Sequence, residues 1–144
     1  MTMNNQEIIK SLEAIIEALK AEKQEEVTTF DFGDGPVPAH RHKNPDGTLG
    51  GWVANTATVA DTAYIGENAQ VFGNAQVFNS AVVCDNARVS DNARVSDNAL
   101  VSGKAWVFGK AWVSGDALVS GKARVYGHAV VYGDVKLESG TYYE

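Results

Sequence analysis

Branched apolar residues recur at every sixth position from Val53 to Leu137. Fifteen consecutive steps carry Val, Ile or Leu at this position, without a miss. Alanine stands four residues after each of the first thirteen, from Ala57 to Ala129, and Val135 replaces it at the fourteenth. Two apolar columns with a period of six therefore run through this segment. A short, fixed period indicates a solenoid, because one repeat alone buries too little apolar surface to be stable.

The residues between the two columns predict how the chain turns. The second residue after each branched one is mostly Gly, Asp or Asn, which tolerate turns and positive φ. Side chains alternate along an extended strand, so the neighbours of each core Val must point outward. Three six-residue steps suffice for one coil with three strands. We therefore predict a parallel β-helix of about five triangular coils over residues 52–139.

Two runs, VFGNAQVFNSAVV and VSGKAWVFGKAWVSGDALVSGKARVYG, closely resemble the motif of the hexapeptide-repeat proteins. The resemblance implies an all-β solenoid, namely a left-handed parallel β-helix that assembles as a homotrimer with the helix axes side by side. The small bacterial and phage members are more similar to this chain than the enzymes are. The period itself does not determine the handedness, and parallel crossovers are normally right-handed. A right-handed β-helix of the bactofilin kind is therefore the structural alternative.

Residues 1–26 predict an amphipathic α-helix. Asn4 is suited to cap the helix, and Glu7 follows three positions later. Four apolar residues have the spacing of a seam between helices: Ile8, Leu12, Ile15 and Leu19. Ile9 and Ile16 widen the apolar face beyond this seam. This face is too apolar to remain in water. It has three candidate partners: the end of the solenoid, which it would cap, the same helix in other copies, and a different protein.

Residues 27–51 show no sustained period and contain all three prolines, and we predict that they form an ordered linker. At the other end of the chain, we predict a tail over residues 140–144. The linker contains His40 and His42, with Asp31, Asp34 and Asp46 nearby. Two histidines spaced by two on a strand share one face, a geometry that zinc or nickel can use. Two histidines are not a complete site, and we expect no metal and no cofactor. The other roles are hydrogen bonding to the first coil and contact with a ligand between subunits.

The residues that flank the core valines predict three outward faces when the coils stack by eighteen residues. One face carries an apolar ridge beside a row of small residues, as a close subunit interface requires. We predict that this ridge and the helix form the oligomer interface, through Ile8, Leu12, Ile15, Leu19, Tyr64, Val82, Leu100 and Leu118. The alternative is a ladder of like residues with no partner.

Arginine and tryptophan alternate on the other two faces. They could stack on each other in ladders, or they could bind a flat anion, with guanidinium groups on phosphate and indoles on the ring. The candidate ligand-binding residues are Arg88, Arg94, Trp106, Trp112 and Arg124, together with His40 and His42.

Charge and composition exclude some classes of function. The net charge is −6, and neither residues 1–52 nor the remainder is basic, which disfavours binding to duplex nucleic acid. The chain has one cysteine, no apolar run of membrane-spanning length and no basic leader. These features predict a cytoplasmic protein that does not bind membranes.

The resemblance also points to enzymes, because the known ones of this repeat family are mostly acyltransferases with a histidine base. Those enzymes interrupt their coils with an active-site loop, whereas these coils are unbroken, and His128 lies at a predicted turn. We expect no enzymatic activity but a homotrimer that presents a rigid surface to an unknown protein, as a scaffold or as a phage-encoded inhibitor of a host factor. The alternatives are a trimer that binds a small anion such as a nucleotide between subunits, and an acyltransferase.

Overall fold

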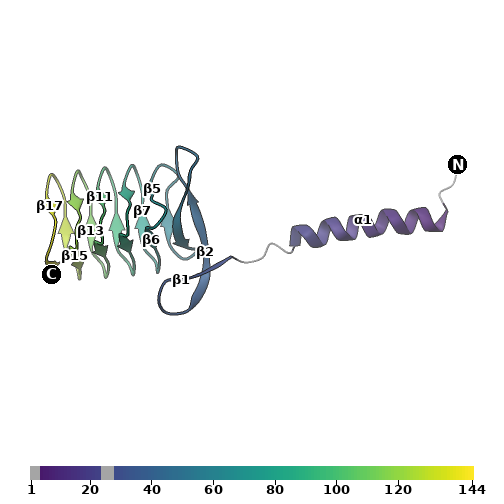
Figure 1. Ribbon diagram of the computed structural model, residues 1–144, viewed down its shortest axis with the longest axis horizontal. Helices are drawn as coiled ribbons and strands as arrows, with labels where there is room; N and C mark the ends of the chain where they lie inside the picture. The colour runs from purple at the N-terminus through teal and green to yellow at the C-terminus, as the bar shows by residue number, and fades with distance from the viewer. Residues whose placement is uncertain (1–3, 24–27) are drawn as a thin grey trace.

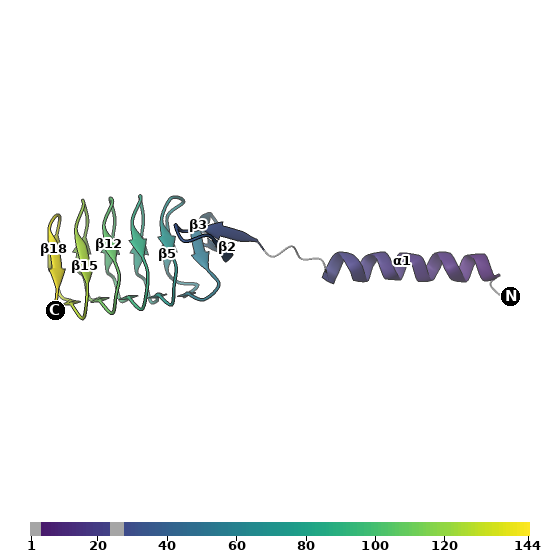
Figure 2. The ribbon, with the colours of Figure 1, turned by 90° about the horizontal axis from the view of Figure 1, so that it is seen from below.

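A computed structural model describes residues 4–23 and 28–144 as one helix and a solenoid of stacked parallel coils (Figure 1). Short strands of successive coils lie side by side in three sheets, which Figure 2 shows from a second direction. The second and third sheets have five strands each, so the solenoid has about five turns. The predicted β-solenoid with an N-terminal helix is thus confirmed.

The first sheet contains, in order, β1 (Thr29–Asp31), β2 (Pro36–Lys43), β3 (Leu49–Ala54), β6 (Gln70–Val71), β9 (Arg88–Val89), β12 (Trp106–Val107), β15 (Arg124–Tyr126) and β18 (Thr141–Tyr143). The second sheet contains β4 (Thr58–Val59), β7 (Gln76–Val77), β10 (Arg94–Val95), β13 (Trp112–Val113) and β16 (Val130–Val131). The third sheet contains β5 (Tyr64–Ile65), β8 (Val82–Val83), β11 (Leu100–Val101), β14 (Leu118–Val119) and β17 (Lys136–Leu137).

The column of branched residues forms the core. From β3 to β14, each strand pairs in parallel with the strand eighteen residues later, so that Val53 pairs with Val71 and Val77 with Val95. Every core Val from Val71 to Val125 is fully buried, and the alanine column is buried beside it. Burying one such Val stabilises the fold by about 1.5 to 3 kcal/mol. The inward direction of this column is therefore confirmed.

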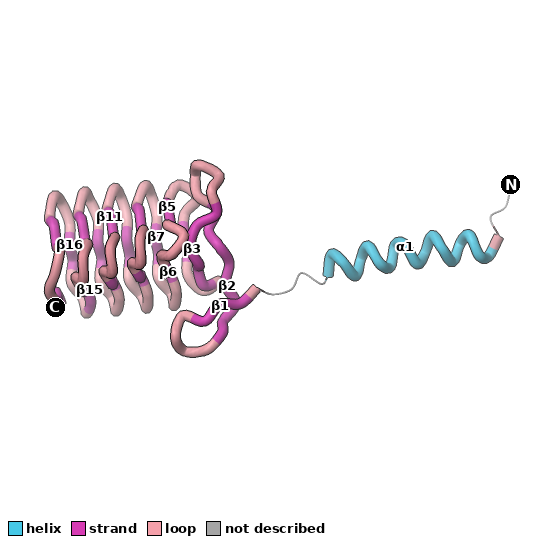
Figure 3. The backbone as a smooth tube through the Cα atoms, viewed as in Figure 1, coloured by secondary structure: helices cyan, strands magenta, loops and turns pink. Residues whose placement is uncertain are grey.

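Turns join the short strands of each coil (Figure 3), and hydrogen bonds link the turns of neighbouring coils. Three aspartates, Asp85, Asp91 and Asp97, have φ of 56° to 58°, and glycine takes this position in most other turns. The carboxylate of each aspartate accepts a hydrogen bond of 3.0 Å from the N–H of the glycine eighteen residues later. From Gly73 to Gly133, the backbone at this position has positive φ, which favours Gly, Asn and Asp, and the three aspartates also link neighbouring coils.

Residues 28–48 form a cap on the N-terminal edge of the solenoid, where the sequence predicted only an ordered linker. β1 pairs antiparallel with β2, and β2 pairs antiparallel with β3. The side chain of Asn44 is buried and bonds to both backbone groups of Ile65, donating to the carbonyl oxygen (3.1 Å) and accepting from the N–H (2.9 Å). We call residues 28–48 the N-terminal cap.

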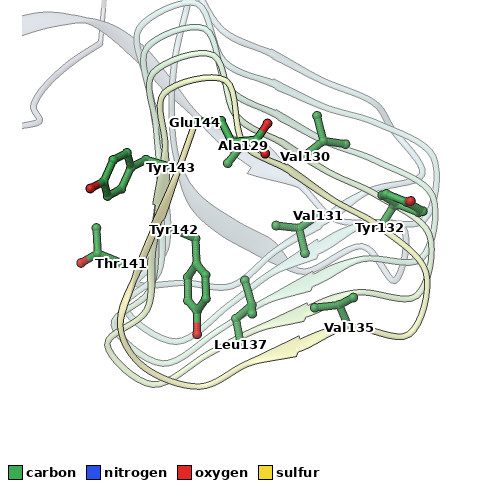
Figure 4. A pocket seen from close by; sticks show the side chains of 10 residues that line it. All are labelled: Ala129, Val130, Val131, Tyr132, Val135, Leu137, Thr141, Tyr142, Tyr143 and Glu144. Atoms are coloured by element: carbon green, nitrogen blue, oxygen red, sulfur yellow. The ribbon is translucent and has the colours of Figure 1, made fainter.

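The last residues continue the first sheet as β18, although the sequence predicted a tail over residues 140–144. β18 pairs in parallel with β15, and Val125 is opposite Tyr142. The step is seventeen residues here, which shifts β18 out of the six-residue period. Figure 4 shows Tyr142 and Leu137 directed into the interior of the last coil, where they help to line a cavity. Because Tyr142 does not fall on the six-residue period, the sequence pattern does not predict its inward direction.

The helix α1 (Asn5–Lys23) begins where the sequence predicts, because the N–H of Glu7 donates to Oδ1 of Asn4 at 2.9 Å. Its apolar side chains are all between 42% and 55% exposed: Ile8, Ile9, Leu12, Ile15, Ile16 and Leu19. Among the residues that the structure describes, nothing covers this face. Among the described residues, no helix is both long and apolar enough to cross a lipid bilayer.

Candidate functional site

The first sheet carries a ladder of stacked cations and aromatic rings on its outer face. Strand pairing brings Arg88, Trp106 and Arg124 into one column. The guanidinium of Arg88 lies 4.8 Å from the ring centre of Trp106 and 5.1 Å from that of Phe72. Arg124 lies 5.3 Å from the centre of Trp106 on the other side. The predicted column is present, and its guanidinium groups already have aromatic partners.

The other predicted ligand-binding pair lies on a different sheet. Arg94 and Trp112 face outward from the second sheet, with the guanidinium 5.8 Å from the indole centre. The Trp112 indole N–H donates to Oγ of Ser96 at 3.0 Å, much as that of Trp106 donates to Ser90 on the first sheet. The five candidate residues therefore form two ladders and do not converge on one site.

The two histidines of β2 have separate hydrogen-bond partners. His42 is buried, and its Nε2 donates to the carbonyl oxygen of Ala63 at 2.8 Å. His40 is exposed, and its Nδ1 donates to Oδ1 of Asn55 at 2.7 Å. These contacts give both rings a role in the N-terminal cap. In residues 4–23 and 28–144 no group of three or more His, Cys, Asp or Glu side chains is arranged to hold a metal ion.

The predicted ridge lies on the outer face of the third sheet. Strand pairing aligns Tyr64, Val82, Leu100 and Leu118 in one column. Tyr64 is 36% exposed, and the three aliphatic side chains are half-buried in the monomer. The adjacent row contains Gly66 and Cys84, and a Cβ on Gly66 would lie only 3.0 Å from the Cα of Cys84.

Cys84 stands in this row with its thiol partly shielded. Burial raises the pKa of the Cys84 thiol, and the neighbouring carboxylate of Asp85 raises it further. Both effects disfavour the thiolate, which is the reactive form. The thiol is therefore poorly suited to act as a nucleophile.

Sequence reasoning missed a groove between the N-terminal cap and the first sheet. Phe32 is buried, and its ring stacks on Phe72 with 4.9 Å between ring centres. Its carbonyl oxygen accepts a hydrogen bond of 2.8 Å from Nη2 of Arg88. Two adjoining cavities share Phe32, Asp34, Phe72 and Asp91 among their walls. The available signal was the alternation of Phe30 and Phe32 before Gly-Asp-Gly-Pro, which indicates an apolar strand face in need of a partner.

The fold and these surfaces define a β-solenoid repeat protein with a capped N-terminal edge. A family model described as the YdcK beta solenoid repeat matches residues 69–85, 87–103 and 93–109. These matches lie in the middle coils, so the chain is similar to this family over that part. Comparisons with curated proteins and with solved structures gave no match.

Proposed function

We propose that the protein is a homotrimer without catalytic activity that presents the rigid surface of its solenoid to another protein. The observation that carries the proposal is the ridge on the third sheet. Leu100 and Leu118 form a continuous outward aliphatic column. The residues beside them in the adjacent row, Ser102 and Ser120, are small and would leave room for a second subunit. Outward apolar ridges that stay partly exposed in the monomer are characteristic of subunit contacts.

The exposed face of α1 supports the same assembly. If Ile8 and Ile15 occupy the d positions of a heptad, Leu12 and Leu19 occupy the a positions. Leucine at a and isoleucine at d favour bundles of more than two helices. A helix of this length is marginal alone in water, so the solenoid contact and the helix contact would strengthen each other.

The interface can be tested with charged substitutions on two sheets. We expect Leu100→Lys with Leu118→Lys to dissociate the trimer, because two buried ammonium groups per subunit would lack partners. Gln76→Lys with Trp112→Lys is the matched control, since it adds lysines just before the core valines of the second sheet. The measurement is molar mass by light scattering. A double variant of the third sheet that keeps the wild-type mass would refute this interface.

We also propose a cytoplasmic location and, from the likeness to small phage proteins, a host protein as the partner. Cell fractionation tests the location, and affinity capture with the wild-type protein tests the partner. Capture that is lost with charged substitutions on the outer faces, in a protein that still assembles, would support binding by the solenoid surface.

A second candidate function is the binding of a small anion such as a nucleotide. It is favoured by Arg124, which is exposed and stacks against both Trp106 and Phe108. Native mass spectrometry of freshly purified protein would reveal a bound molecule. The acyltransferase alternative is tested by thermal shift with acetyl-CoA, which should leave the melting temperature unchanged.

A further inference from the structure

The loop of the N-terminal cap overhangs the first sheet in a fixed position. Oδ1 of Asp31 accepts hydrogen bonds from the N–H groups of Gly33 (2.7 Å) and Gly35 (3.1 Å), which shapes the loop. Phe32 fastens the loop to the sheet by stacking on Phe72, and its carbonyl oxygen is bound by Arg88. The space beside this loop is therefore preformed, and a ligand that enters it has little ordering cost to overcome.

The groove has an apolar side and an aromatic floor. Val37 and Pro38 of the cap form one wall, and Phe72 forms the floor, which continues past Arg88 to Phe108. Val37 is 39% exposed, so the apolar surface is open to solvent. A groove with these walls fits an aliphatic or aromatic side chain.

Two carboxylates stand at the edges of the groove. Asp34 belongs to the loop and forms no side-chain hydrogen bond among the described residues, while Asp91 uses only Oδ2, to accept from Gly109 at 3.0 Å. Both aspartates are exposed. Arg88 is the cation nearby, but its guanidinium lies between the rings of Phe72 and Trp106 and under the loop. The charge presented at the opening is therefore negative, which selects a cationic group and rejects an anion.

We propose that this groove is the contact site for the partner protein, and that it binds an extended segment in which a Lys or Arg side chain follows an apolar one. The apolar side chain packs against Val37 and Pro38, beside the Phe72 ring that already stacks with Phe32 and Arg88. The cation is held between the carboxylates of Asp34 and Asp91, in charge-assisted hydrogen bonds. The inference rests on the proposed function, for which it supplies the surface and the chemistry of the partner.

The position of the groove is compatible with assembly through the third sheet. The groove is built by the N-terminal cap and by the first sheet with the turns that follow its strands, such as those at Asn55, Gly73 and Asp91. None of its lining residues belongs to the ridge from Tyr64 to Leu118. The groove therefore stays accessible when the ridge is covered.

The test uses the full-length protein and a blocked peptide probe, acetyl-Gly-Leu-Arg-Leu-Gly-amide, with a second peptide that carries citrulline in place of arginine. In a ¹H–¹⁵N NMR titration we expect shifts confined to residues of the groove, from Phe32 to Pro38 and around Phe72 and Asp91. Citrulline keeps the shape and removes the charge, and we expect it to bind about tenfold more weakly, the effect of losing a charge-assisted contact.

Two variants test whether the peptide binds at this site. Asp34→Asn with Asp91→Asn should weaken the arginine peptide about tenfold. Asp85→Asn is the matched control, because Asp85 has a similar φ of 56° and the same single bond to a glycine N–H as Asp91, yet lies outside the groove. Asparagine already takes this backbone conformation at Asn79, so these changes preserve the turn.

The outcomes separate this inference from the assembly. Equal affinity for the two peptides, shifts outside the groove, or no shifts at millimolar peptide would overturn the groove proposal. The mass of the same sample, measured by light scattering, decides the trimer independently. A monomer that binds the arginine peptide in the groove would refute the trimer and support the groove proposal. A trimer without shifts in the groove would support the assembly and refute the groove proposal.

Discussion

The side chain of Asn44 replaces a strand residue opposite Ile65. Its amide accepts from the N–H of Ile65 at 2.9 Å and donates to the carbonyl oxygen at 3.1 Å, which are the bonds that a preceding coil would otherwise make. β5 is the first strand of the third sheet, so without Asn44 its edge would lack these partners. A single buried amide thus closes the N-terminal edge of this sheet.

Asn44→Ala should therefore lower the free energy of unfolding by about 1 to 3 kcal/mol, because two buried backbone groups lose their partners. Equilibrium denaturation in urea measures the change. Asn74→Ala is a suitable control, since Asn74 is an exposed residue in a turn. Similar losses in both variants would show that Asn44 has no special role in the cap.

Glycine in the turns has two separable effects. Gly103 and Gly133 both have positive φ, of 63° and 70°. A Cβ on Gly103 would lie 2.8 Å from the N of Gly121 in the next coil, whereas a Cβ on Gly133 would meet nothing within 4 Å. We expect Gly133→Ala to cost about 1 kcal/mol through backbone strain alone, and Gly103→Ala to cost more because the coils must also separate. Thermal unfolding compares the two variants, and equal losses would contradict the close stacking of turns.

Much of the fold could be predicted from the sequence because each coil repeats the same local rule. The valine column and the turn residues are set by contacts between positions eighteen residues apart. The N-terminal cap could not be predicted, because its contacts join residues at long and irregular separations in sequence. Phe32 contacts Phe72 and Arg88, and Asn44 bonds to Ile65. The arginine and tryptophan columns and their division between two faces were predicted correctly, because the stacking by eighteen residues determines both.

Arg88 holds the loop of the N-terminal cap, and its buried Nε has no hydrogen-bond partner among residues 4–23 and 28–144. Arg88→Lys removes the planar group that bonds to Phe32 and stacks on two rings. We expect faster hydrogen exchange across residues 31–38 in this variant. Arg94→Lys is the control, because Arg94 is exposed on the second sheet. Unchanged exchange in Arg88→Lys would show that ring stacking alone holds the loop.

The rate at which Cys84 is alkylated tests whether its thiol pKa is raised and whether its row on the third sheet is shielded. The raised pKa lowers the fraction of thiolate at any pH below it, so iodoacetamide should modify Cys84 more slowly at pH 8 than it modifies a short cysteine peptide. Asp85→Asn removes the repulsive carboxylate and should increase the rate modestly. Mass spectrometry follows the reaction. Modification at the rate of the peptide would contradict the shielding of this row.

The assembly of the solenoid is tested most directly by sedimentation equilibrium of the full-length protein. The account predicts a single species with three times the 15.4 kDa mass of the chain at micromolar concentration. A single species of 15.4 kDa under the same conditions would contradict it, because the ridge of the third sheet and the apolar face of α1 would then both remain in water.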